Sequence, residues 1–227
     1  MSERRLIIAI DGPAGSGKST TARLLAKRLG YTYLDTGAFY RALTLKVLES
    51  GVSPEDAAGV LRLAETIKIE LLPEQDRNRV FLDGREVTKA IRSPEVTNAI
   101  APISENAKVR AIMVEQQRAI GRQGGVVMEG RDIGTVVFPD ADLKIFMQAS
   151  LDERTRRRQQ ELAAEGTFRD YAVLRQEIEQ RDLKDANRKV APLRRAADAI
   201  TLDNTNMTIE QQVEFILHAL RKKLETR

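Results

Sequence analysis

The sequence predicts an α/β fold built on a parallel five-stranded sheet with flanking helices. Five short apolar runs, typical of buried strands, alternate with helical patterns along most of the 227 residues. Between residues 63 and 100 the pattern changes to polar–apolar alternation around an Asp-Gly pair, which is typical of an antiparallel hairpin. We therefore expect a core made of residues 1–62 and 101–227, with a small antiparallel subdomain inserted at 63–100.

The first predicted strand is the apolar run at 6–11, and a glycine-rich stretch follows it directly. That stretch consists of Gly12, Pro13, Ala14, Gly15, Ser16, Gly17, Lys18, Ser19 and Thr20. Apolar residues at helical spacing then predict a helix over 18–29. A strand, the motif G-x-x-x-x-G-K-S and a helix form a P-loop, whose backbone N–H groups cradle phosphates. The sequence thus predicts a nucleoside triphosphate site, where Lys18 reaches the β- and γ-phosphates and the Ser19 hydroxyl ligates Mg²⁺.

The next elements continue the alternation of strand and helix. A short strand is predicted at 31–34 and a helix at 38–49, an order that favours parallel strands with helices on both faces. Ser53 followed by Pro54 is typical of an N-cap with proline at the first helical position, so a helix is expected from there to about Thr66. In the insert, strands are predicted at 67–71, 79–82 and 85–88, with Asp83-Gly84 as the turn.

Helical and strand patterns also alternate in the second half of the chain. Helices are predicted from Ser93-Pro94 onward and at 106–123, 154–164 and 171–189, and strands at 126–128, 143–147 and 199–202. The apolar face of the 106–123 helix consists of Val109, Ile112, Met113 and Ile120. A last helix carries an amphipathic stripe of Ile209, Val213, Ile216, Leu217, Leu220 and Leu224.

Composition narrows the chemistry that this chain can perform. It has no cysteine, which excludes disulfides, zinc–thiolate sites and thiol catalysis, and its single histidine, His218, lies in the last predicted helix. The net charge of +4 would suit nucleic acid, but aromatic residues make up only 4% of the chain. We therefore expect the arginines to face a phosphate-bearing small molecule, with no nucleic-acid partner. No run is long enough for a membrane span or a signal-peptide core, so a cytoplasmic protein without a membrane partner is expected.

Four stretches together resemble bacterial cytidylate kinases. They are the P-loop, residues 34–41 (LDTGAFYR), residues 129–141 (EGRDIGTVVFPDA), and residues 181–193 from Arg181-Asp182 to Pro192-Leu193. The P-loop alone occurs in many unrelated proteins, whereas the stretches at 129–141 and 181–193 are far more specific. The resemblance covers nearly the whole chain. It implies a P-loop kinase core, a CMP-binding insert at 63–100 and a helical lid at about 151–170, and it implies ATP-dependent phosphorylation of CMP and dCMP.

The resemblance also implies which residues form the acceptor site. The implied CMP-binding residues are Thr36, Arg41, Arg110, Arg131, Asp132, Arg181, Asp185 and Arg188. Among them Arg41, Arg131 and Arg188 contact the acceptor phosphate, and Arg131 and Arg188 are catalytic together with Lys18. Arg181, Asp185 and Arg188 are spaced i, i+4, i+7 and therefore share one helix face.

The remaining acceptor contacts involve the sugar and the base. The resemblance implies that Arg181 and Asp185 hold the ribose hydroxyls and that Arg110 and Asp132 contact cytosine. It also implies a cytosine-contacting serine shortly before Arg110. This chain has Ala101 there and Ser104 three residues later, which leaves open which of the two takes that place.

On the donor side, the resemblance places basic residues of the lid over ATP. Arg154, Arg157 and Arg158 share a face in the lid segment, and Arg157 and Arg158 are the candidates for covering the ATP phosphates. Glu129 stands where related kinases more usually carry aspartate, and is implied to orient Mg²⁺ through water. Mg²⁺ is the one cofactor expected.

The residues support this chemistry independently of the resemblance. A phosphate acceptor is mostly dianionic at pH 7, so its phosphorylation needs converging cations rather than a general base. Two alternatives stay open: a kinase for another small acceptor such as UMP or AMP, and a P-loop ATPase that acts on nucleic acid. The second would need a water-positioning residue and aromatic side chains along a basic groove, and the sequence supplies neither. A monomer that binds ATP and CMP or dCMP is expected.

Overall fold

The main sheet of the protein is parallel and contains five strands. The computed structural model describes residues 5–73, 78–164 and 166–225. The strands are β1 (Ile7–Asp11), β2 (Thr32–Asp35), β6 (Val126–Gly130), β7 (Leu143–Gln148) and β8 (Ile200–Asp203), in the order β2-β6-β1-β7-β8. β1 lies at the centre, which explains its unbroken apolar run, because a central parallel strand is buried on both faces. The predicted fold class is confirmed.

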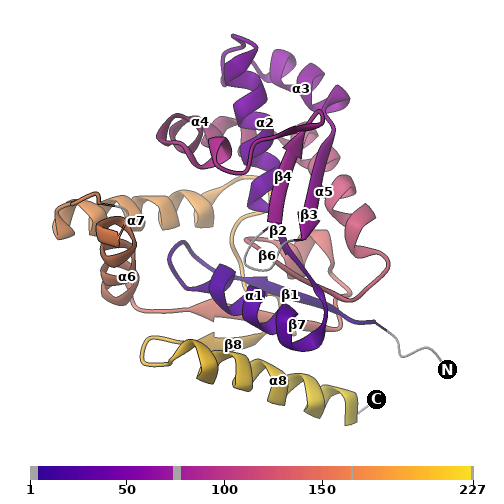
Figure 1. Ribbon diagram of the computed structural model, residues 1–227, viewed down its shortest axis with the longest axis vertical. Coiled ribbons are helices and arrows are strands. Elements are labelled where there is room, and N and C mark those ends of the chain that lie inside the picture. Colours follow the sequence, from indigo (N-terminus) through magenta and orange to yellow (C-terminus); the bar gives the residue numbers. More distant parts are fainter. Residues whose placement is uncertain (1–4, 74–77, 165, 226–227) are drawn as a thin grey trace.

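Helices cover both faces of this sheet (Figure 1). On one face α1 (Lys18–Leu29) and α8 (Ile209–Glu225) pack against Ile8 and Ile10 of β1, while α2 (Gly37–Glu49) and α5 (Ala107–Gly121) cover the other face, where Ala9 points. The predicted apolar stripes are buried only along their middles. Ile120 near the end of α5 and Ile209 and Leu224 at the ends of α8 are 38%, 40% and 49% exposed.

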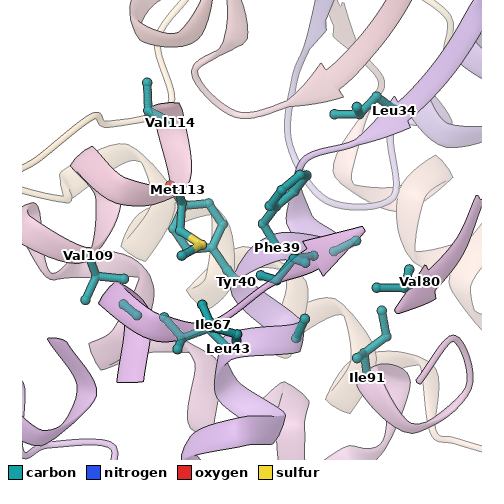
Figure 2. Packing of buried hydrophobic residues seen from close by; sticks show 14 of the residues in the cluster. Leu34, Phe39, Tyr40, Leu43, Ile67, Val80, Ile91, Val109, Met113 and Val114 are labelled. Carbon is teal, nitrogen blue, oxygen red and sulfur yellow. The ribbon is translucent and has the colours of Figure 1, made fainter. Parts of the chain in front are cut away.

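A small antiparallel sheet lies against the α2 side of the molecule. It consists of β3 (Ile69–Pro73), β4 (Asn78–Leu82) and β5 (Arg85–Glu86), in that order. Asp83 and Gly84, both with positive φ, make the tight turn that the Asp-Gly pair predicted. Figure 2 shows Ile67 and Val80 of this region packed with Leu34 and Phe39 of the main core. The insert therefore shares one apolar core with the parallel sheet, and its assignment as a CMP-binding subdomain stays a prediction.

Three helices complete this side of the molecule, and one of them begins later than the sequence predicts. α4 (Pro94–Glu105) begins where the sequence predicts a helix, and Ser93 caps it by accepting from the N–H of Val96. The predicted cap of α3 (Ala57–Thr66) at Ser53 is wrong. Residues 53–56 form a turn instead, and the Asp56 carboxylate caps the helix by accepting from the N–H of Gly59 at 3.0 Å. α5, which begins at 107, is capped by the side chain of Asn106.

Two charged helices, α6 (Leu151–Ala164) and α7 (Tyr171–Asn187), pack against each other beside the carboxyl end of the main sheet (Figure 1). A single π-helical turn, Ile133–Val137, follows β6 at the same end, and the P-loop follows β1 there. In an open parallel sheet, ligands bind at the carboxyl ends of the strands. Within the described ranges, no helix is both long and apolar enough to cross a membrane.

Candidate active site

The P-loop, residues 12–19, wraps around the start of α1. Gly12 passes so close to β7 that a Cβ atom there would lie 2.1 Å from the carbonyl oxygen of Met147, and Gly17 has a φ of +85°. Only glycine fits the first of these positions without displacing β7. The ammonium group of Lys18 donates to the carbonyl oxygen of Pro13 at 2.7 Å. The loop thus forms a ring of backbone closed by its own lysine, at a helix N-terminus suited to anions.

The charge on Lys18 is held in an unfavourable setting. Its side chain is buried, and burial together with the positive charge of Arg131 lowers its pKa to about 7, although Glu129 and Asp11 act in the opposite direction. A phosphate group beside Lys18 would reverse this shift, since an opposite charge favours the ionised form. The lysine is therefore placed to gain from an anion.

A hydrogen-bond network supports the P-loop from behind. The Asn204 side chain, after β8, donates to the carbonyl oxygen of Ser16 at 2.7 Å and to the side chain of Gln212 at 3.1 Å. Gln212 also accepts from the Thr21 hydroxyl at 2.6 Å. Arg157, a predicted ATP contact, donates to the carbonyl oxygen of Asn204 at 2.9 Å. Asn204 and Gln212 were missed by the sequence reasoning because neither belongs to a recognisable motif.

The arginines of α6 take different positions. Arg154 is buried and donates to the carbonyl oxygens of Ala14 in the P-loop and Ala149, each at 3.1 Å, and it pairs with Asp182 of α7. Arg158, the second predicted ATP contact, pairs with Glu161 at 3.1 Å on the exposed side of the helix. The P-loop is thus linked to both α6 and α7 through Arg154, whose place in this link the sequence did not indicate.

Glu129, at the end of β6, lies at the centre of a buried group of oxygen atoms. The Tyr33 hydroxyl donates to its carboxylate, and the exposed Ser19 hydroxyl lies near enough to help lower the pKa of Glu129. Burial and the neighbouring Asp35 raise the pKa of Glu129, while Lys18 lowers it. The sequence reasoning missed Tyr33, which burial keeps neutral by raising its pKa. The predicted metal residues Ser19 and Glu129 are therefore brought together.

Four of the predicted acceptor residues form a group of cations close to Lys18. Arg131 donates to the Asp185 carboxylate at 2.8 Å, and Arg188 donates to the carbonyl oxygen of Asp185 at 3.4 Å. Arg41, in α2, donates to the Thr97 hydroxyl at 3.1 Å. Arg181 is the fourth, and burial beside Arg131 lowers its pKa to about 10.

Several of these arginines lack enough acceptors of their own. Burial is the main cause of the lowered pKa values of Arg41 and Arg188, and Arg131 lowers both further. The Nη2 atom of Arg188 is buried and has no hydrogen-bond partner among the described residues. Like charges gathered in a partly buried cleft repel one another unless an anion lies between them. The group is therefore suited to a phosphate.

A buried ion pair lies further from the P-loop. Arg110 of α5 pairs with Asp132, and their side chains are only 5% and 8% exposed. The Arg110 guanidinium also donates to the carbonyl oxygen of Ser104 at 3.1 Å and stands 5.2 Å above the Tyr40 ring. The Tyr40 hydroxyl is buried without a partner in the described part of the chain. Together these polar groups can recognise a flat polar ligand. No signal in the sequence had indicated Tyr40 as one of them.

Two predicted contacts are already engaged elsewhere. The Thr36 hydroxyl is buried and donates to the carbonyl oxygen of Glu129 at 2.8 Å, so it ties the end of β2 to β6. The Ser104 hydroxyl donates to the carbonyl oxygen of Ala101 at 3.0 Å, within its own helix. In this conformation neither hydroxyl points freely at the acceptor site, and their contacts with CMP stay predictions.

Comparisons with known proteins show the family to which the chain belongs. The family model described as cytidylate kinase matches residues 8–222. A cytidylate kinase of Geobacillus thermodenitrificans is 47% identical over 222 residues, which are 98% of this chain and 99% of that protein. A cytidylate kinase of Pelotomaculum thermopropionicum is 52% identical over 211 residues, covering 92% and 93% of the two chains. The fold resembles a shikimate kinase of Acinetobacter baumannii, with a TM-score of 0.50 at 14% identity over 97% of this chain and 95% of that one. The chain belongs to the cytidylate kinase family.

Proposed function

We propose that this protein transfers the γ-phosphoryl group of ATP to CMP, and also to dCMP, giving ADP and the pyrimidine diphosphate. The observation that carries the proposal is the position of the Arg110–Asp132 pair and of the arginine group beside one P-loop. A triphosphate donor, a phosphate acceptor and a flat polar base each meet a matching set of side chains there. Family membership supports the same activity.

Residues 12–20 bind the donor phosphates through backbone N–H groups, and Lys18 places its charge on the phosphoryl group that moves. Electrostatic stabilisation of this kind is the main contribution of proteins to phosphoryl transfer. We propose that α6 completes the donor site when it closes. Arg158 is free to turn from Glu161 toward the phosphates at small cost, because an exposed pair contributes little. Arg157 would first have to leave Asn204.

The residues at the end of β6 fit a magnesium ion. Mg²⁺ is usually held by one or two protein oxygens together with substrate phosphates and water, rather than by a full cage of side chains. The Ser19 hydroxyl and the Glu129 carboxylate lie beside each other, and no cluster of three or more metal-binding side chains occurs in the described ranges. We propose that Ser19 holds Mg²⁺ and that Glu129 orients its water. The ion would neutralise charge on the donor phosphates.

On the acceptor side the chain orients a nucleophile that needs no activation. A dianionic phosphate oxygen already carries the electron pair that attacks the γ-phosphorus. We propose that Arg41, Arg131 and Arg188 hold this phosphate in line. The Nη2 atom of Arg188, which has no hydrogen-bond partner among the described residues and lies 3.9 Å from the Asp185 carboxylate, would be one donor. Arg181 and Asp185 would hold the ribose hydroxyls. Orientation by several fixed cations lowers the entropic part of the barrier.

We propose that Asp132 and Arg110 select cytosine. Cytosine presents an amine at N4 and acceptors at N3 and O2, which match a carboxylate and a guanidinium. Uracil presents an acceptor at O4 and a donor at N3. The Asp132 carboxylate would therefore face another acceptor, and the Arg110 guanidinium would face another donor. Mispairing in a closed site that hydrogen-bonds its substrate costs up to about 10⁴-fold in rate.

The activity is tested by incubating the purified protein with ATP, Mg²⁺ and one monophosphate at a time, and measuring ADP. We expect rapid ADP formation with CMP and dCMP, and rates lower by about 10²- to 10⁴-fold with UMP or AMP. Equal rates with all four would show that the base is not read. ADP formation without any monophosphate at the CMP rate would indicate an ATPase instead. A cytoplasmic location, a monomeric state and the absence of a nucleic-acid partner stay predictions.

A further inference from the structure

Asp11, the last residue of β1, connects the donor and acceptor halves of the cleft. Its side chain is only 5% exposed. One carboxylate oxygen accepts from the N–H of Ile133 and the other from the N–H of Gly134, both at 2.8 Å. These are the first two N–H groups of the π-helical turn that follows Asp132. The carboxylate therefore caps a turn that lies more than a hundred residues away in the sequence.

A cap of this kind is normally supplied by the residue just before the turn. The first N–H groups of a helical turn have no partner inside it, and aspartate is among the best residues for capping them from the preceding position. Asp132 occupies that position, but its side chain makes no capping bond. Its carboxylate pairs with Arg110 instead. Only its backbone oxygen serves the turn, by accepting from the N–H groups of Val136 and Val137.

We propose that Asp11 is a positioning residue for base selection: by capping the 133–137 turn, it leaves the Asp132 carboxylate free to contact cytosine. This inference rests on the proposed reading of the base by Asp132. Without Asp11, the two N–H groups would need another acceptor, and Asp132 stands at the position from which aspartate commonly caps such groups. Its carboxylate would then turn back onto its own backbone and away from Arg110 and the base.

Two features of the surroundings support this role. Asp11 is fixed by the sheet, since it pairs in register with Gly130 of β6 and Phe146 of β7, so the cap has little freedom to move. Burial raises the pKa of Asp11 to about 6, while the hydrogen bonds from the N–H groups of Gly134 and Ile133 act in the opposite direction and favour the charged carboxylate.

The test is Asp11→Asn, which keeps the shape but replaces one acceptor oxygen with an N–H donor. We expect the ratio of kcat/KM for CMP to that for UMP to fall at least about 10-fold, the equivalent of one lost hydrogen bond in a buried site. The KM for CMP should rise while the KM for ATP changes less than about twofold. The matched control is Asp142→Asn. Asp142 is also buried, and it accepts from the N–H of Ile7 at 2.9 Å at the opposite end of β1. It should leave the ratio unchanged.

A double-mutant cycle with Asp132→Ala separates this role from a general structural one. If Asp11 acts through Asp132, Asp11→Asn should not change the CMP-to-UMP ratio further once Asp132 is absent. The inference would be overturned if Asp11→Asn alone left the CMP-to-UMP ratio unchanged, or if it lowered the ratio equally with Asp132 present and with Asp132→Ala. It would also be overturned if Asp11→Asn affected only the KM for ATP. Should Asp11→Asn fail to fold, Asp11→Ala carries the same expectation, because it also removes the cap.

Amide hydrogen exchange distinguishes failure of this inference from failure of the proposed function. The N–H groups of Ile133 and Gly134 should be protected in the unaltered protein and in Asp132→Ala, and should exchange faster in Asp11→Asn. If Asp132→Ala itself leaves the CMP-to-UMP ratio unchanged, the proposed base reading is wrong, whatever the exchange shows. If Asp132→Ala changes the ratio but Asp11→Asn neither changes it nor releases these amides, the role of Asp11 alone is wrong.

Discussion

At the level of single residues, the cleft holds charges that the ligand-free protein does not favour. Lys18 is buried beside Arg131, and burial lowers the pKa values of Arg41, Arg181 and Arg188. Among the described residues, the buried Nη2 of Arg188 has no hydrogen-bond partner. The free energy spent on keeping these groups charged is recovered when phosphates bind, which is how a site favours anions over water.

For Lys18 this has a measurable consequence in proton uptake. Its pKa of about 7 leaves it mostly neutral at pH 8, and bound phosphates raise the pKa, so ATP binding should take up most of one proton there. At pH 6 the lysine is already charged, so proton uptake by Lys18 on ATP binding should be close to zero. Isothermal titration calorimetry in buffers of different ionisation enthalpy measures the number of protons taken up.

The matched control for this measurement is Lys18→Met, which keeps the length of the side chain without its charge. The variant should show no proton uptake beyond that of ATP itself, and its kcat should fall at least about 100-fold. The buried position suits methionine, so the thermal midpoint should not decrease. Uptake equal to that of the unaltered protein at pH 8 would mean that Lys18 is not the titrating group.

At the level of elements, α6 and α7 bury few of their side chains. Only Leu174 and Ile178 of the α7 side chains are buried, whereas Phe168 in the connection is 86% exposed and Leu183 is 57% exposed. α6 is held to the P-loop at its start by Arg154. Helices with few buried apolar contacts open at low free energy, and lids belong to this class.

We predict that binding of both substrates moves this helix pair over the donor phosphates. Hydrogen exchange in residues 151–164 and 166–170 should slow markedly with a bisubstrate analogue that joins the donor and acceptor nucleotides, because the arginines of α6 gain partners and water is excluded. α8 packs on the sheet away from the cleft and serves as the internal control. Unchanged protection in α6, with the analogue shown to be bound, would contradict a lid at this position.

The sequence was sufficient to predict the elements whose signals are local. The P-loop strand and helix, the Asp83-Gly84 turn and the start of a helix at Ser93-Pro94 each depend on a few neighbouring residues, and each is confirmed. The α3 cap was predicted wrongly because Ser53 and Asp56 are both good capping residues and only the packing of the turn decides between them.

At the level of the whole molecule, the site forms where loops after β1, β2 and β6 meet at the carboxyl edge of one parallel sheet. The position of this edge follows from the predicted fold class. The contacts between side chains at this edge could not be predicted, because the partners are far apart in sequence. Asn204 supports the P-loop from 188 residues away, and Tyr33 contacts Glu129, which lies 96 residues away. The predicted roles of Thr36 and Arg157 show the same limit, since both side chains are occupied by distant backbone groups.

The central claim is that this molecule selects its acceptor by reading the base with Asp132. The most direct measurement is kcat/KM for CMP and for UMP in the unaltered protein and in Asp132→Ala, with Asp132→Asn as the variant that preserves packing around Arg110. Asp132→Ala should lose most of its CMP activity, and the CMP-to-UMP ratio should narrow at least about 10-fold, because the mismatch with O4 of uracil disappears along with the match to N4 of cytosine. If both substrates lose activity equally and the ratio is unchanged, Asp132 only orders the loop, and the account of specificity given by this structure is wrong.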